Sequence, residues 1–306
     1  MSELRKHILS AIAYFDLFSY PLTIDEVYLF LPAKYCQEDF GHALRGLVIE
    51  RRIYKLEKYY TLRNDHFLVE RREKGNAKAK EMMITARKVC DWLVRFPYVR
   101  GIAISGSLSK NFAEEDSDID LFVITKKNRL WIARTVMHLF KKLTFLVKKE
   151  HYFCMNYYID ELDLEIHEKN IYTATEVTTL IPLNGDTIFE HFFAANNWTR
   201  EYLPNKYLRV STAKPLKISP LKRVAEFIFN NRFGNALDNL LMRITVSRWD
   251  KKMLAQKRNN RGFIMGMDAG KHYTKPDPVN FQNKLIARYE ERITQLNERI
   301  EGIAVN

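Results

Sequence analysis

The segment formed by residues 99–124 constrains the fold more than any other part of this 306-residue chain. It opens with a short apolar run rich in β-branched residues, which is typical of a buried strand. A turn at Gly106 and Ser107 follows. After an acidic loop comes a second apolar run, and Asp118 and Asp120 lie at its start. Because successive side chains of a strand point to opposite faces, the two aspartates should share one face. The pattern predicts two strands of a sheet, joined by a turn and a short helix.

The two aspartates and the Gly-Ser turn point to phosphate and metal chemistry. Two carboxylates on one face repel each other unless cations neutralise them, and such hard oxygen ligands suit Mg²⁺ that is held partly by phosphates. Gly106 lets the backbone approach a phosphate closely, the helix start offers unpaired N–H donors, and the Ser107 hydroxyl adds another donor. Lys110 lies one turn further on, where it either reaches a phosphate or projects into solvent. The competing interpretation is a strand, a turn and a helix with a solvated acidic loop.

These residues resemble the signature of the nucleotidyltransferase superfamily, which has the fold of DNA polymerase β. The chain is similar to the bacterial stand-alone and antibiotic-modifying nucleotidyltransferases over about residues 98–200. The resemblance implies that Gly106 and Ser107 contact the phosphates of a nucleotide, and that Asp118 and Asp120 bind catalytic Mg²⁺ or Mn²⁺. The implied reaction moves a nucleoside monophosphate from a nucleoside triphosphate, with ATP as the first expectation, to a hydroxyl acceptor. Pyrophosphate is released.

A third carboxylate usually lies on a neighbouring strand in this family. The predicted strand at residues 152–159 offers Asn156 where that acid is expected, so we include Asn156 with the two aspartates as a metal ligand. An amide oxygen can bind Mg²⁺ but cannot accept a proton as a base. Asp160 and Glu165 are the alternatives. An active enzyme and a catalytically degenerate, nucleotide-sensing relative therefore remain alternatives.

The first 75 residues resemble a winged helix-turn-helix domain. Apolar periodicity predicts three helices, and the alternation at residues 53–62 predicts a hairpin. The segment carries 12 Lys+Arg and 11 acids, and the third helix places Glu38 and Asp39 beside His42 and Arg45. Acidic side chains on the helix that would enter the DNA groove would be repelled by the phosphates of the duplex. A regulatory or dimer-forming role is therefore favoured over DNA binding, and a homodimer is one form that we expect.

The sequence predicts an α+β protein with a mixed sheet. Its expected parts are a winged-helix-like domain at 1–75, a linker helix at 76–97, a nucleotidyltransferase core at 98–170 and a helical C-terminal region at 171–306.

Basic charge gathers in the C-terminal half. The chain has a net charge of +12, and residues 206–261 hold 14 Lys+Arg against three acids, a net charge of +11. Polyanions such as RNA are natural partners of such a surface, and a protein acceptor is the alternative. We name Lys222, Arg223, Lys251 and Lys252 as candidates for an RNA-binding groove. A solvated helical surface without a ligand is the competing interpretation.

Composition narrows the class of protein further. No apolar run approaches the ~18 residues that a membrane span needs, and the N-terminus lacks a signal-peptide layout. The three cysteines, Cys36, Cys90 and Cys154, form no disulfide framework and no zinc motif. We therefore expect a cytoplasmic protein without a membrane partner. Three functions compete: a nucleotidyltransferase, a nucleotide-sensing regulator that uses its winged helix to bind DNA or protein, and an RNA-binding scaffold.

Overall fold

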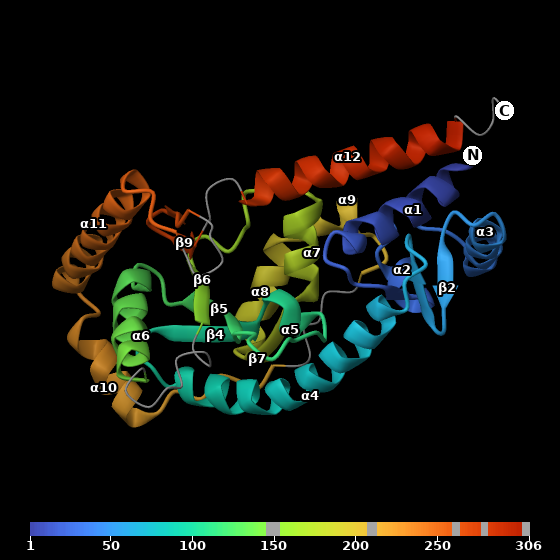
Figure 1. The fold of residues 1–306 in the computed structure, drawn as a ribbon. Helices are drawn as coiled ribbons and strands as arrows, with labels where there is room; N and C mark the ends of the chain where they lie inside the picture. The colour runs from blue at the N-terminus through green and yellow to red at the C-terminus, as the bar shows by residue number, and fades with distance from the viewer. Residues whose placement is uncertain (145–153, 207–212, 259–263, 277–280, 302–306) are drawn as a thin grey trace.

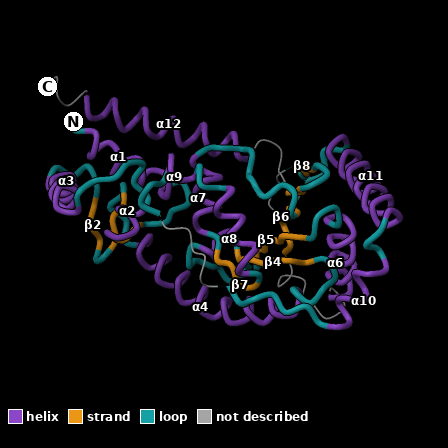
Figure 2. The backbone as a smooth tube through the Cα atoms, turned by 180° about the vertical axis from the view of Figure 1, so that it is seen from behind, coloured by secondary structure: helices purple, strands orange, loops and turns teal. Residues whose placement is uncertain are grey.

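The computed structural model describes residues 1–144, 154–206, 213–258, 264–276 and 281–301 (Figure 1). An N-terminal unit lies at one end of the molecule, and a sheet with covering helices forms the rest (Figures 1 and 2). Two long helices join these parts: α4 (Phe67–Leu93) continues from the N-terminal unit under the sheet, and α12 (Phe281–Glu301) returns to pack on the first helix. None of the helices in the described ranges has the length and apolar character needed to cross a bilayer.

The N-terminal unit consists of three helices and a small antiparallel sheet in the order β1-β3-β2. Its elements are α1 (Glu3–Asp16), β1 (Leu22–Thr23), α2 (Ile24–Leu29), α3 (Gln37–Ile49), β2 (Tyr54–Leu56) and β3 (Tyr59–Thr61). α2 begins at a capping box, in which the Thr23 hydroxyl accepts from the Glu26 amide while the Glu26 carboxylate accepts from the Thr23 amide. The three helices and the hairpin lie where the sequence places them. Membership of the winged-helix class stays a prediction.

The central sheet has six strands in the order β7-β4-β5-β6-β9-β8. β4 and β5 are neighbours in one sheet, as expected, and they run antiparallel. β5 and β6 run parallel, so the sheet is mixed and the fold is α+β. The strands are β4 (Val99–Ile104), β5 (Asp120–Thr125), β6 (Cys154–Asp160), β7 (Ile181–Asn184), β8 (Met267–Ala269) and β9 (Tyr273–Pro276).

Helices cover both faces of the sheet because successive residues of β4 and β5 are buried, most of them apolar, and their side chains point to opposite faces. Leu121 and Val123 enter a core shared with α4 and α6, whereas Phe122 and Ile124 face the aromatic side chains of α8. The remaining helices are α5 (Gly106–Ser109), α6 (Leu130–Thr144), α7 (Ile171–Thr179), α8 (Asp186–Ala195), α9 (Thr199–Tyr202), α10 (Pro220–Ile228) and α11 (Arg232–Leu254).

The division into a core at 98–170 and a C-terminal region at 171–306 stays a prediction, but the second range is not purely helical. The second of these ranges supplies β7, β8 and β9 to the central sheet. These strands are only three or four residues long, and β7 contains Pro182. Such short segments carry too few residues for a period-2 pattern to be visible in the sequence.

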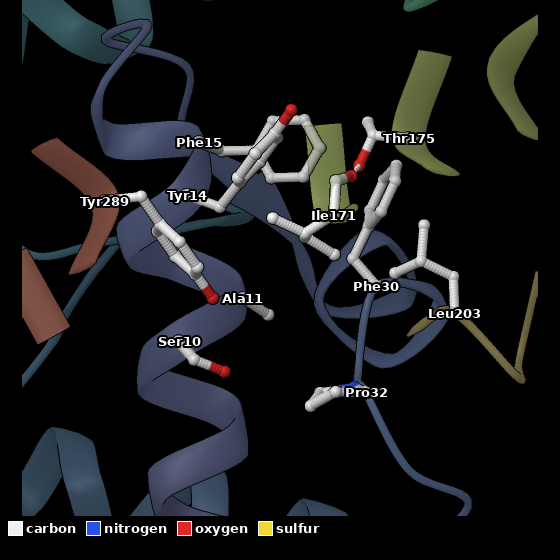
Figure 3. Close-up of a pocket in the computed structure, with 10 residues that line it drawn as sticks. All are labelled: Ser10, Ala11, Tyr14, Phe15, Phe30, Pro32, Ile171, Thr175, Leu203 and Tyr289. Atoms are coloured by element: carbon white, nitrogen blue, oxygen red, sulfur yellow. Dashed lines mark hydrogen bonds between the residues drawn. The ribbon is translucent and has the colours of Figure 1, made fainter. Parts of the chain in front are cut away.

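Helices α1, α7 and α12 meet at a closely packed junction (Figure 3). The ring of Tyr14 on α1 lies 5.6 Å from that of Tyr289 on α12, edge to face, and the Tyr14 hydroxyl interacts with Thr175 of α7. The space left among the lining residues is about 20 Å³, roughly one water molecule. Arg292 of α12 pairs with Asp16 of α1 at 3.0 Å. The N-terminal unit is therefore packed against the rest of the chain.

A buried ion pair attaches α10 to the start of β4. Both nitrogen ends of the Arg100 guanidinium donate to the Glu226 carboxylate, at 2.9 and 2.7 Å, and the Tyr98 amide donates to it at 2.8 Å. The Lys222 ammonium, which is only 2% exposed, donates to the carbonyls of Val94 and Val99. Lys222 therefore belongs to the interior, and its expected place in a surface groove for RNA is wrong.

The attachment gives stability that depends on pH. Burial alone would raise the pKa of Glu226, but hydrogen bonds from Arg100 and from the Tyr98 amide outweigh it and lower that pKa. A carboxyl group with a lowered pKa in the folded state stabilises the fold above its unfolded value of 4.5, and the contribution is lost as the pH falls through the folded-state pKa.

We predict that Glu226→Gln lowers the free energy of unfolding by about 3 kcal/mol at neutral pH, because Arg100 would be left buried with only the longer contact to Glu161, at 3.7 Å, as its counter-charge. Urea unfolding measures the loss, and the difference from the native chain should shrink as the pH falls below 4.5. Glu190→Gln, at an exposed position of α8, is the control and should change stability by less than about 0.5 kcal/mol. Equal losses in both variants would contradict the assignment.

Candidate active site

The Gly-Ser turn is held against the first residue of β5. The Ser105 amide donates to the Asp120 carbonyl at 2.9 Å, and Gly106 then opens α5 with φ of +65°. Side chains with a Cβ rarely adopt this conformation. A Cβ at position 106 would also overlap Oδ2 of Asp120. Position 106 therefore requires glycine for two reasons: the backbone has a positive φ, and the Asp120 carboxylate occupies the space that a Cβ would need.

The two aspartates flank a core residue, as the sequence predicts. Asp120 is the half-buried first residue of β5, Asp118 lies two residues before it, and Ile119 between them is fully buried. Burial, followed by the negative charges of Asp118 and Glu176, raises the pKa of Asp120 to about 6. Without a bound cation, the surroundings of Asp120 thus disfavour its ionised carboxylate. A cation bound beside Asp120 would favour the ionised form.

Lys110 lies at the turn, with its ammonium directed back along α5. It donates to the Gly106 carbonyl at 3.1 Å and to the Glu176 carboxylate at 2.8 Å. Its side chain is 17% exposed, so the projection into solvent does not occur. Ser107, in contrast, is exposed at the surface of the turn. Lys110 therefore links the Gly-Ser turn to α7, and Ser107 is the accessible hydroxyl.

The residue of β6 opposite Asp120 is Cys154. The register pairs Asp120 with Cys154 and then shifts, so that Leu121 pairs with Met155 and Phe122 with Tyr157. A hydrogen bond with Cys154 lowers the pKa of Asp120 and so opposes the effect of burial. Asn156, the expected third ligand, falls at this shift, and its side chain lies outside the described residues. The residue of β6 that pairs with Asp120 is therefore Cys154, and Asn156 as a metal ligand stays a prediction.

The two alternative acids lie elsewhere. Asp160 pairs with Thr125 at the other end of β5, five residues or roughly 17 Å along that strand from Asp120. Its buried carboxylate accepts from the amides of Asn128 and Leu162, which is a structural role. Glu165 pairs with Lys169 at 2.7 Å. Neither side chain joins the aspartates.

Glu176 is the site residue that sequence reasoning missed. It comes from α7, more than fifty positions beyond Asp120, and reaches the site through Lys110 and through its charge on Asp120. The one available signal is weak: Glu176 is the only acid between Ile171 and Gly185.

The donor set fits a divalent cation that shares its ligands with a substrate. Within the ranges that the structure describes, no group of three or more His, Cys, Asp or Glu side chains is arranged to hold a metal ion. Mg²⁺ ordinarily uses one or two carboxylates and completes its octahedral shell with water and phosphate oxygens. Asp118 and Asp120 supply the carboxylates, and the raised pKa of Asp120 indicates negative charge that a cation would stabilise.

Comparison with known proteins agrees with this geometry. Residues 84–189 match the family model described as a nucleotidyltransferase domain. The matched range extends from within α4 into α8 and contains the Gly-Ser turn, both aspartates, Lys110 and Glu176. No curated protein and no solved structure matches the chain.

We predict that Gly106→Ala disrupts the turn and weakens nucleotide binding at least about tenfold, because the new Cβ is strained at positive φ and displaces the Asp120 carboxylate. Calorimetric titration with a nucleoside triphosphate and Mg²⁺ measures the loss. Gly46→Ala in α3 is the matched control, since a Cβ there meets nothing within 4 Å. Unchanged affinity in a folded Gly106→Ala chain would show that the turn does not bind the nucleotide.

Proposed function

We propose that the chain, whose residues 84–189 are a nucleotidyltransferase domain, transfers a nucleoside monophosphate from a nucleoside triphosphate to an acceptor hydroxyl and releases pyrophosphate. A bond forms between the acceptor oxygen and the α-phosphorus, and the bond from that phosphorus to the bridging oxygen of pyrophosphate breaks. The observation that carries the proposal is the contact between the Gly106 turn and the Asp120 carboxylate, since it brings a phosphate-binding backbone and a metal-binding group together.

The residues of the turn bind and orient the triphosphate. Gly106 leaves room for a phosphate to approach the backbone, and the exposed Ser107 hydroxyl can donate to a phosphate oxygen. Lys110 holds the turn in place through the Gly106 carbonyl and adds positive charge close to the phosphates. We propose that its main role is to position the turn, because Glu176 already occupies its ammonium.

Asp118 and Asp120 would hold Mg²⁺ or Mn²⁺ together with the phosphates. Such an ion neutralises the charge that develops on the phosphate oxygens during transfer. The two carboxylates fix where the ion lies, and Cys154 and Lys110 constrain the Asp120 side chain. ATP is the expected nucleotide, and an RNA end or a protein side chain is the expected acceptor.

A second candidate, a nucleotide-sensing regulator, is supported by contacts between the N-terminal unit and the turn. The Tyr20 hydroxyl donates to the Lys110 carbonyl, and the Tyr20 ring packs edge-on against Phe112 at 5.8 Å. A cavity of about 490 Å³ separates the two units at this point, lined by Phe30 and Lys80 among others. A nucleotide that moved the turn would thus act directly on the N-terminal unit. The absence of a carboxylate at Cys154 also favours this candidate.

The two candidates are separated by incubating the chain with labelled nucleoside triphosphates, Mg²⁺ and RNA or protein acceptors. We predict labelled product and pyrophosphate from the native chain. Asp118→Asn combined with Asp120→Asn should lower this activity more than about a hundredfold and abolish metal-dependent nucleotide binding, because the carboxylates that hold the ion are gone.

Asp116→Asn is the matched control, since Asp116 is an exposed acid of the same loop. It should retain activity and binding. Nucleotide binding without any transfer would favour the regulator, and metal-dependent binding that survives in the double variant would contradict the site itself.

A further inference from the structure

Helix α10 is inserted with its polar side inward and its apolar side outward. Lys222 and Glu226 are buried, at 2% and 7% exposure, whereas Leu221 and Phe227 are 80% and 83% exposed. Val224 lies on the same outward side and is also exposed. Surface helices of globular proteins ordinarily show the opposite arrangement.

This orientation is fixed by strong interactions. The Glu226 carboxylate takes a bidentate hydrogen bond from Arg100, and the Lys222 ammonium donates to the carbonyls at the end of α4 and the start of β4. Turning the helix over would take the Glu226 carboxylate away from the buried Arg100 and the Lys222 ammonium away from the two carbonyls, at high cost. The outward apolar side is therefore part of the folded state.

Helix α11 also carries exposed apolar side chains, and Phe233 at its start stacks on Phe229 at the end of α10, with ring centroids 6.1 Å apart. Helices α10 and α11 lie at the end of the molecule that is remote from the N-terminal unit (Figures 1 and 2). We define the α10–α11 face by its exposed apolar side chains, which are Leu221, Val224, Phe227, Ile228, Phe233 and Leu240. Clustered exposed side chains of this size mark interaction sites more often than single ones do.

The charged side chains around this face are cationic. Between residues 213 and 249 the only acids are Glu226 and Asp238, and both are buried. The exposed charged residues of that stretch are Lys214, which pairs with Asp91 of α4, and Lys217, Arg223, Arg232, Arg243 and Arg248. An occupant of the α10–α11 face therefore meets apolar side chains that are flanked by positive charge.

We propose that the α10–α11 face docks on the surface of an anionic lipid bilayer. Helices that lie in a membrane interface combine protruding Leu and Phe with flanking Lys and Arg, which attract acidic headgroups. A second copy of the chain would bring like charges together, and RNA would leave Leu221 and Phe227 without apolar partners. From the sequence we expect no membrane partner, because no apolar run is long enough to span a bilayer. A helix that lies flat on the bilayer surface does not need such a run.

Co-sedimentation of the full chain with vesicles tests the proposal. Vesicles of phosphatidylcholine mixed with phosphatidylglycerol should bind the chain at least about tenfold more tightly than phosphatidylcholine alone, and added salt should weaken the binding. Leu221→Ser with Phe227→Ser should lower binding to the mixed vesicles about tenfold or more, because less apolar surface enters the bilayer. Lys217→Glu with Arg223→Glu should lower it as well. Nucleotide binding checks that each variant is folded.

The matched control is Ile49→Ser with Phe67→Ser, at positions that are 81% and 63% exposed in the N-terminal unit. It should leave vesicle binding unchanged. The proposal is overturned by any of four results: no preference for anionic vesicles, an equal loss in the control, a dimer in solution that Leu221→Ser with Phe227→Ser abolishes, or RNA binding by the face in place of vesicle binding.

Discussion

The approach of the Asp120 carboxylate to the backbone of Gly106 is the constraint on which the central sheet and its candidate site depend. It requires the antiparallel pairing of β4 and β5, with the turn folded back over the first residue of β5. Once Asp120 faces the turn, alternation assigns every later residue of β5 to a face of the sheet. Phe122 then meets α8, which follows α7 and β7 in the chain, and α7 is the helix that brings Glu176 to the site. Leu121 enters the opposite core.

The parts of the site that are close in sequence could be predicted from sequence. A turn, a short helix and two aspartates within residues 99–124 specify their own arrangement, because the covalent chain and strand alternation leave few alternatives. The mixed sheet could be expected from the resemblance to the nucleotidyltransferase superfamily. Capping at Thr23 and Glu26 similarly marks the start of α2 in the printed sequence.

The parts that depend on long-range register could not be predicted. One shift in the pairing of β5 with β6 decides that Cys154 faces Asp120, and such a shift has no local signature. Glu176 joins the site only because α7 packs beside the turn. Lys222 looks like a surface lysine in a basic helix, and only its packing against β4 shows that it is buried.

The arrangement of the central sheet has a consequence for the order in which the chain can fold during synthesis. β8 and β9 come from residues 267–276 yet pair beside β6, and α12 reaches back to α1, where Arg292 and Asp16 are 276 positions apart. Contacts of such sequence separation form late, because a long loop must close first. While a ribosome is still producing the last helices, the nascent chain can already hold β4, β5 and the turn, but β6 has an open edge. Nascent chains of this protein therefore carry an unpaired strand edge until residues 267–276 arrive, which is the period when they are most prone to aggregate.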